Sequence, residues 1–211
     1  SMSLAPHAIH LRDGKKLGDA EIIDTMIKDG LWDAFHGYHM GITAENVAEK
    51  FQVTREEQDK FALKSQEKAL VAQKENKFKN EIINFKIKSK KAEINFNKDE
   101  HPREGINLEA LSRLKPAFKK DGTVTAGNSS GINDGAAAVT LMSGDEANKR
   151  NIEKLVSIKS WASCGVDPAL MGTGPIPSSK KALELAGWSI KDVDLFEINE
   201  AFAAQSIAVI K

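Results

Sequence analysis

Apolar segments and helix signals alternate along the C-terminal part of the chain, and this order constrains the fold more than any other feature. Strand-like apolar runs extend over Gly135 to Met142, Leu155 to Ala162 and Val193 to Ile198. Between the last two runs, Ser178 is expected to cap a helix that ends at Gly187. Such alternation favours an α/β layer architecture, because each helix must bury its apolar face against a sheet.

The polar and irregular chain before these segments carries two helix signals. We expect Thr43 to cap the first helix. Thr54, followed three residues later by Glu57, has the spacing of a capping box. The helical period of the apolar residues behind it predicts a second helix that runs to about Lys74.

Two short runs after the second helix alternate apolar and polar residues. The first run covers residues 83–87 and the second residues 94–96, and the polar Ser89 to Lys91 lies between them. Period-two alternation on both sides of a polar turn predicts a β-hairpin.

Composition and charge exclude several classes of protein. Of the 211 residues, 41% are hydrophobic and 28% are charged, which is typical of a folded globular chain. The 30 basic residues balance the 30 acidic ones, so no overall field attracts nucleic acid or an anionic membrane. The single cysteine, Cys164, excludes an internal disulfide framework. We therefore expect a cytoplasmic protein with neither nucleic acid nor membrane as a partner.

Both ends of the sequence suggest a partial chain. Ile207 to Lys211 stops inside an apolar helical run without a terminating Gly, Asn or Pro. The opening Ser1-Met2-Ser3 is compatible with a tag remnant or with the interior of a longer polypeptide.

The segment Asn199-Glu200-Ala201-Phe202-Ala203 joins an expected strand to a helical run. At such a junction Asn199 would open the helix, close to backbone N–H groups that point outward. This arrangement suits an oxyanion or an ordered water. The alternative is that Asn199 only caps the helix, because asparagine is a favoured N-cap.

A loop rich in glycine and small polar residues runs from Thr125 to Gly135. Its open backbone suits a long ligand arm that carries amide groups. It lacks the lysine of a P-loop and the spacing of a dinucleotide loop, which disfavours a nucleotide-phosphate cradle. The alternative is a tight loop that enters a buried strand.

Three further features have a functional and a structural interpretation. His36 and His39 have no cysteine or third histidine beside them, so we expect no metal site, but rather one polar contact from a histidine beside the flexible Met40. Met171 to Pro177 is expected to be a rigid Gly/Pro loop before a helix. Cys164 precedes turn-forming residues rather than a helix, so a structural role is expected for it.

Several of these motifs together resemble the thiolase family, and in particular its biosynthetic branch. The resemblance is carried along the whole chain, in the same order as in the family, by Ser1 to His7, Gly37 to Gly41, Leu114 to Phe118, Thr125 to Ala138, Met171 to Pro177 and Asn199 to Gln205. The first of these segments resembles interior sequence of the family, which agrees with a partial chain.

The resemblance implies a layered αβαβα fold with a long inserted loop domain. Residues 1–132 would form most of the loop domain, which binds substrate and coenzyme A. Residues 133–151 would close the N-terminal half of the fold, and residues 152–211 would begin its C-terminal half.

The resemblance also implies a chemistry. Family members of this branch condense two molecules of acetyl-CoA to acetoacetyl-CoA and CoA, reversibly, as homotetramers, with the CoA thioester as substrate and no further cofactor. Asn199 would hold the water of an oxyanion hole. The implied substrate- and CoA-binding residues are Leu31, His39, Met40, Arg103, Ala117, Phe118, Ser130, Ile132, Met171, Ala201 and Phe202.

The reacting groups of the family have no counterpart in this sequence. The nucleophilic cysteine, the histidine of a Gly-His-Pro motif and the acid/base cysteine all fall outside the matching segments, and Cys164 matches neither cysteine motif. We therefore expect the 211-residue polypeptide alone to be inactive. The alternatives are a degradative 3-ketoacyl-CoA thiolase and a thiolase-like lipid carrier without condensation activity.

Overall fold

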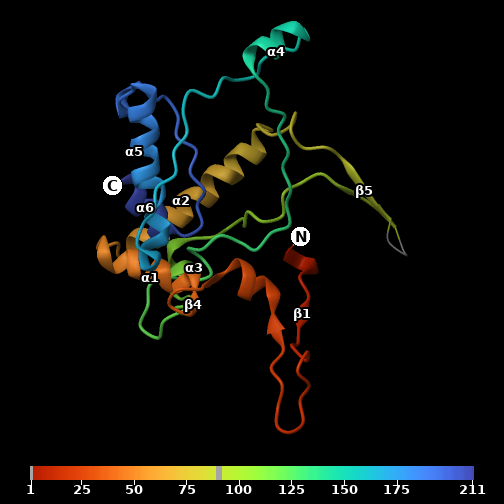
Figure 1. The fold of residues 1–211 in the computed structure, drawn as a ribbon, viewed down its shortest axis with the longest axis vertical. Helices are drawn as coiled ribbons and strands as arrows, with labels where there is room; N and C mark the ends of the chain where they lie inside the picture. Colours follow the sequence, from red (N-terminus) through yellow and green to blue (C-terminus); the bar gives the residue numbers. More distant parts are fainter. Residues whose placement is uncertain (1, 89–91) are drawn as a thin grey trace. The chain divides into compact units, whose positions relative to one another are not determined.

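The computed structural model describes residues 2–88 and 92–211 (Figure 1). These residues form two compact units. Unit 1 comprises the chain up to Asn46 together with Ile132–Asn199. Unit 2 comprises Val47–Gly131 together with Glu200–Lys211. Each unit therefore joins segments that are distant in the sequence.

Three helices lie wholly within the described part of unit 2. The long α2 (Arg55–Lys74) packs against α3 (Leu108–Ser112) and α6 (Ala203–Ile210). A small apolar core forms where Ala48, Val53 and Ala204 meet, with Phe51 and Ile207 packed around them.

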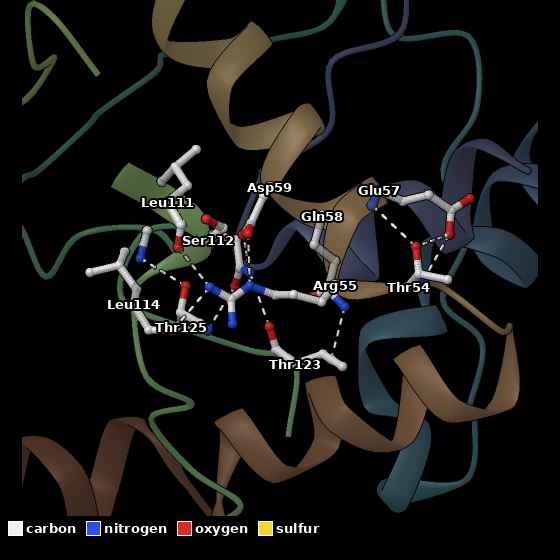
Figure 2. A network of polar contacts seen from close by, with 12 residues as sticks. Thr54, Arg55, Glu57, Gln58, Asp59, Leu111, Ser112, Leu114, Thr123 and Thr125 are labelled. Atoms are coloured by element: carbon white, nitrogen blue, oxygen red, sulfur yellow. Dashed lines mark hydrogen bonds and ion pairs between the residues drawn. The ribbon is translucent and has the colours of Figure 1, made fainter. Parts of the chain in front are cut away.

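The start of α2 agrees with the sequence prediction. The Thr54 hydroxyl accepts from the Glu57 N–H over 3.2 Å, and the Glu57 carboxylate accepts from the Thr54 N–H over 2.7 Å (Figure 2). Both halves of the capping box are thus made, and the helix ends at Lys74 as expected.

The predicted hairpin is present in unit 2. Strand β5 (Phe85–Lys88) pairs antiparallel with β6 (Glu93–Phe96), and Phe85 lies opposite Phe96. The expected turn, Ser89 to Lys91, lies outside the described residues.

Unit 1 contains short elements. In chain order they are η1 (Met2–Leu4), β1 (His7–Ala8), β2 (Ile23–Asp24), the π-helical η2 (Met26–Gly30), β3 (Trp32–Asp33), β4 (Tyr38–His39), α4 (Gly144–Lys149), η3 (Pro168–Thr173), α5 (Pro175–Ala186) and η4 (Ile190–Asp192). β1 pairs antiparallel with β2, and β3 with β4. Helix α1 (Met40–Lys50) begins in unit 1 directly after β4.

The prediction of three strands in the C-terminal part of the chain was wrong for this structure. Residues 135–142, 155–162 and 193–198 are drawn without arrows in Figure 1, and the described part of the chain pairs none of them with a neighbour. Most of their apolar side chains are exposed: Leu155 is 92% and Val139 is 83% accessible. Alternation and apolarity indicate a capacity for β-structure, but a strand also needs a partner to take its backbone hydrogen bonds.

Two helix starts were placed too late. Thr43 and Ser178 lie inside helices, because α1 begins at Met40 and α5 at Pro175. Each hydroxyl donates to a carbonyl one turn back: Thr43 to Met40 over 2.6 Å, and Ser178 to Gly174 over 2.7 Å. The prediction of a loop at Met171 to Pro177 is also wrong. Most of this segment is helical, at the end of η3 and the start of α5, because proline suits the first turn of a helix.

The end of α5 was predicted correctly. Gly187 follows the helix with φ +70°, in the left-handed region that glycine adopts without steric cost. Its N–H bonds back to the carbonyls of Leu183 and Glu184, which completes the helix terminus.

Candidate functional site

The loop of residues 125–131 in unit 2, called the binding loop below, is held by its own side chains. The Asn128 Oδ1 accepts from the Thr125 N–H over 2.8 Å, and the Ser129 hydroxyl donates to the Thr125 carbonyl over 2.7 Å. Thr125 and Asn128 are buried. The loop is therefore a set of tight turns whose backbone conformation is strongly determined.

Gly127 allows the binding loop to lie against Leu111 of α3 and against Leu114, two residues beyond that helix. A Cβ atom at this position would come within 2.5 Å of Leu114 Cδ1 and 2.6 Å of Leu111 Cδ2. Close approach of the backbone, rather than an unusual φ, is the reason for glycine at this position.

The binding loop is hydrogen-bonded to the segment that enters α6. The Ser130 N–H donates to the Ala201 carbonyl over 3.0 Å, and the Ala203 N–H donates to the Asn128 carbonyl over 2.9 Å. A β-bridge also joins Ser129 to Phe202. The binding loop, which contains two glycines, and the alanine-rich segment that enters α6 are distant in the sequence but neighbours in the fold.

Phe118 adds an aromatic contact to this group. Its ring packs edge-to-face on Phe202, with ring centroids 6.2 Å apart and an angle of 84° between the planes. The N–H of the neighbouring Ala117 donates to Val124, just before the binding loop. Unit 2 therefore brings together five of the predicted residues, namely Ala117, Phe118, Ser130, Ala201 and Phe202.

Unit 1 brings together three others. The Met40 N–H donates to the Leu31 carbonyl over 2.8 Å, and His39 lies opposite Trp32 in the β3–β4 pair. Leu31, His39 and Met40 are all partly buried, and they lie at the point where β4 passes directly into α1.

The protonation of His39 follows from its surroundings. The Gly41 N–H donates to His39 Nδ1 over 3.0 Å, so the proton of the neutral ring is on Nε2. Burial lowers the pKa of His39 below its ordinary value. His39 is accordingly a neutral ring whose Nε2–H is a hydrogen-bond donor.

The second histidine has a structural role. His36 Nδ1 lies 2.7 Å from the buried Asp33 carboxylate, and its ring stacks on Tyr38 with centroids 5.3 Å apart. Burial alone raises the pKa of Asp33, but hydrogen bonds from Phe35 and His36 outweigh it and lower the pKa below its usual value. His36, through its contacts with Asp33 and Tyr38, thus stabilises the turn between β3 and β4.

The described residues hold no cluster of three metal-ligating side chains.

Four predicted residues are not joined to either group by the contacts of the structure. Ile132 and Met171, in unit 1, are 58% and 48% exposed. Arg103 is an exposed residue of unit 2 whose backbone N–H donates to Gln66 Oε1 over 2.9 Å. Asn199 is an exposed residue at the end of unit 1.

Asn199 does not cap or open a helix. Helix α6 begins at Ala203, with Phe202 at the N-cap position and no side-chain cap bond. Both the helix-cap alternative and the expectation that Asn199 opens the helix are therefore wrong. The next residue, Glu200, accepts from the Ser65 hydroxyl of α2 over 2.6 Å.

A cavity of unit 2 lies elsewhere. It has a volume of about 880 Å³ and is lined by the C-terminal turns of α2 and by loop residues such as Phe78, Ile82 and Lys98. Its lining includes none of the predicted binding residues and both signs of charge, so the cavity gives no support to any one ligand.

Sequence reasoning missed three residues of α2. Asp59 bonds to Asn128 of the binding loop, Gln58 bonds to Thr123 just before the loop, and Arg55 bonds to Asp59 and to the carbonyl of Leu111 in α3. An Arg and an Asp four residues apart on a helix are most often a surface ion pair. The burial of Asp59 and Gln58 is the signal that distinguishes these residues from a surface ion pair, and burial is known only from the structure.

No helix in the described part of the chain has the length and apolarity that crossing a membrane requires.

The chain is similar to known proteins along its whole length. The family described as "Thiolase, N-terminal domain" matches residues 1–145, and "Thiolase, C-terminal domain" matches residues 152–211. An acetyl-CoA acetyltransferase of Rhizobium meliloti is 62% identical over the full chain, which covers 54% of that protein. The cytosolic acetyl-CoA acetyltransferase of Rattus norvegicus is 55% identical, also with 54% of its length covered.

Solved structures agree with these sequence matches. The crystal structure of the Bacillus anthracis acetyl-CoA acetyltransferase superposes with a TM-score of 0.92 at 48% identity, over 99% of this chain and 53% of the other. Human mitochondrial 3-ketoacyl-CoA thiolase gives a TM-score of 0.91 at 45% identity, over the same shares of the two chains. The chain spans about half the length of the relatives it matches. The sequence and the fold both show that this chain belongs to the thiolase family.

Proposed function

We propose that the protein is an acetyl-CoA C-acetyltransferase, which condenses two molecules of acetyl-CoA to acetoacetyl-CoA and CoA. The observation that carries this proposal is the grouping of the residues implied by the family resemblance. In unit 2, Ser130 bonds to Ala201 and Phe118 packs on Phe202. In unit 1, Met40 bonds to Leu31 and directly follows His39. The identity of 62% to a curated acetyl-CoA acetyltransferase supports the same activity.

The proposed reaction has two acyl-transfer steps. A cysteine thiolate, supplied by a part of the family fold that this sequence does not match, takes acetyl from acetyl-CoA and releases CoA. A second acetyl-CoA then loses an α-proton to a base, and its enolate carbon attacks the acyl-enzyme and expels the cysteine thiolate. The residues of this chain bind and orient the thioesters and stabilise negative charge on oxygen.

Each group of residues has a proposed role. Met40 forms an apolar wall for the short acyl group, and His39 donates through Nε2–H to a carbonyl of the substrate. Asn199 holds the water of an oxyanion hole, where one donor is worth about 3–4 kcal/mol. The pantetheine arm and the CoA channel are contacted by Leu31, Arg103, Ala117, Phe118, Ser130, Ile132, Met171, Ala201 and Phe202.

The layout of the complete fold is part of the proposal. Residues 1–132 form most of the loop domain, residues 133–151 close the N-terminal half and residues 152–211 begin the C-terminal half of an αβαβα fold. The three exposed apolar segments, residues 135–142, 155–162 and 193–198, become sheet strands when other parts of that fold supply their partners. The complete enzyme is proposed to be a cytoplasmic homotetramer, and the 211-residue polypeptide alone to be inactive.

A degradative activity is the second candidate, and one observation favours it. The TM-score of 0.91 to human mitochondrial 3-ketoacyl-CoA thiolase is nearly equal to that of 0.92 to the Bacillus enzyme. The two candidates differ in the length of acyl chain that the pocket accepts.

Thiolysis kinetics of the full-length protein test the proposal. We expect kcat/KM for acetoacetyl-CoA to exceed that for 3-ketohexanoyl-CoA and longer 3-ketoacyl-CoA substrates. A preference for the longer chains would favour the degradative activity, and no thiolysis of any substrate would refute both. The 211-residue polypeptide and its Cys164→Ala variant serve as controls, and neither should show turnover.

A further inference from the structure

A buried polar network connects the first turns of α2 to the binding loop. Arg55 Nε donates to Asp59 Oδ2 over 2.8 Å, and the same guanidinium donates through Nη2 to the carbonyls of Leu111 (2.7 Å) and Leu114 (3.0 Å) (Figure 2). These carbonyls belong to the last turn of α3 and to the second residue beyond it, a region where helices leave acceptors unsatisfied. Arg55 therefore fixes both the end of α3 and the orientation of the Asp59 carboxylate.

The other oxygen of that carboxylate reaches the binding loop. Asp59 Oδ1 accepts from Asn128 Nδ2 over 3.0 Å, and the same Nδ2 donates to the Thr123 carbonyl over 3.1 Å. Asn128 Oδ1 accepts from the Thr125 N–H. Asp59 and Asn128 are only 3% exposed, so water does not replace these bonds. The side-chain amide of Asn128 is thus held in one orientation by two acceptors and one donor.

The backbone of Asn128 carries this constraint to the predicted binding residues. Its carbonyl accepts from the Ala203 N–H over 2.9 Å, and two residues later the Ser130 N–H donates to Ala201. Ser130 is exposed, whereas its anchor Asn128 is buried. A change at Asp59 must therefore be transmitted to Ser130 and to the start of α6.

We infer that Asp59 is a positioning residue, which through Asn128 holds the binding loop and the Ala201–Ala203 segment in the geometry that receives the pantetheine arm. Asp59 itself contacts neither substrate nor reacting atom in this scheme. The effect on substrate rests on the proposed function, but the effect on the loop does not.

The isosteric variant Asp59→Asn tests this inference. A carboxamide has one acceptor oxygen, so it cannot accept from both Arg55 and Asn128, and one donor is left facing its –NH2 group. A buried donor without an acceptor is costly. We expect amide hydrogen exchange of Ser130 and Ala203 in the full-length protein to accelerate about tenfold or more.

The matched control is Glu56→Gln. Glu56 lies on the same helix and pairs with Lys60, four residues on, as Arg55 pairs with Asp59, but both members of the Glu56–Lys60 pair are largely exposed. Its replacement removes a carboxylate without touching the binding loop. Exchange at Ser130 and Ala203 should stay at the wild-type rate.

A second, milder variant covers the case in which Asp59→Asn does not fold. Arg55→Lys keeps the charge beside Asp59 but loses the forked contact with Leu111 and Leu114. It should accelerate exchange at the same two amides by a smaller factor. Folded variants of either kind with wild-type exchange at both amides would overturn the positioning role.

Steady-state kinetics test the substrate part separately. For Asp59→Asn we expect KM for acetoacetyl-CoA to rise about tenfold while kcat changes about twofold or less, because the residue orients a binding surface rather than a reacting group. Faster exchange with an unchanged KM would overturn the link to substrate. If the wild-type protein turned over no substrate, the proposed function would fail, and the exchange data would still decide whether Asp59 positions the loop.

Discussion

The N–H of Met40 donates to the carbonyl oxygen of Leu31 over 2.8 Å, which ties the first residue of α1 to the residue after η2. This bond holds the Met40 backbone next to His39, at the position proposed to close the acyl pocket. A methionine has three rotatable bonds and fills irregular apolar space well.

Met40→Ala is expected to relax the selectivity for short acyl chains. Removal of the thioether opens space for several more atoms, so kcat/KM for 3-ketohexanoyl-CoA should rise relative to acetoacetyl-CoA, by up to tens-fold, since a methylene in an apolar pocket is worth about 1–3 kcal/mol. The ratio is measured for the full-length protein and its variant. Met26→Ala, at a partly buried methionine of η2, is the control and should leave the ratio unchanged. If Met40→Ala also leaves it unchanged, Met40 does not set chain length.

Asn199→Ala is expected to lower kcat by roughly 10²–10³ with a smaller change in KM, because an oxyanion donor acts mainly in the transition state. The melting temperature should stay within error of the wild type, since α6 begins at Ala203 with Phe202 at its N-cap. Steady-state kinetics and thermal melts of the full-length protein provide both values. A loss confined to KM, or a lower melting temperature with normal kcat, would contradict the oxyanion role.

Thr54→Ala is expected to destabilise the N-terminus of α2. The variant loses the hydroxyl that accepts from Glu57, which costs about 1 kcal/mol in comparable helix caps. Thr54→Ser retains the hydroxyl and should differ little from the wild type. Urea denaturation of the three proteins gives the free energies of unfolding. Equal values for Ala and Ser would show that the capping box contributes no stability.

Stability is expected to depend on pH through His39. Burial places its folded-state pKa below the ordinary value of 6.5, so the unfolded chain takes up the proton first as the pH falls. The fold should therefore lose stability as the pH falls from about 6.5 to the folded-state pKa, with no further loss from this group below it.

Thermal melts between pH 5 and 8 measure this dependence, and an NMR titration of the His39 ring measures the pKa itself. His39→Gln should remove this part of the pH dependence, whereas His10→Gln, at an exposed histidine, should preserve it. If the His39 ring titrated above its ordinary value, burial could not be the dominant influence on its pKa.

Local sequence determined the elements that depend on neighbouring residues. Thr54 and Glu57 are close enough along the chain to form their capping box wherever the helix packs. Gly187 ends α5 because only glycine enters the left-handed region freely. Alternation predicted the hairpin of β5 and β6, although not its register.

Other features depend on partners that are distant in the sequence. Residues 135–142 have the composition of a buried strand, yet the described chain offers them no paired neighbour, and Val139 is 83% exposed. Strand formation is decided by tertiary hydrogen bonding, which periodicity does not reveal. The start of α6 shows the same limit, since an asparagine after an apolar run resembles a helix cap although Phe202 holds that position.

The candidate site combines both kinds of information. The residue types from Thr125 to Gly135 indicated a loop that a ligand could approach closely, and the family resemblance implied which of them bind CoA. Only the tertiary structure showed that Asn128 is buried against Asp59 and that Ser130 bonds to Ala201. The physical reason is that a side-chain amide can cap, turn or bridge with equal chemistry, and the acceptors that folding brings within about 3 Å select one of these roles.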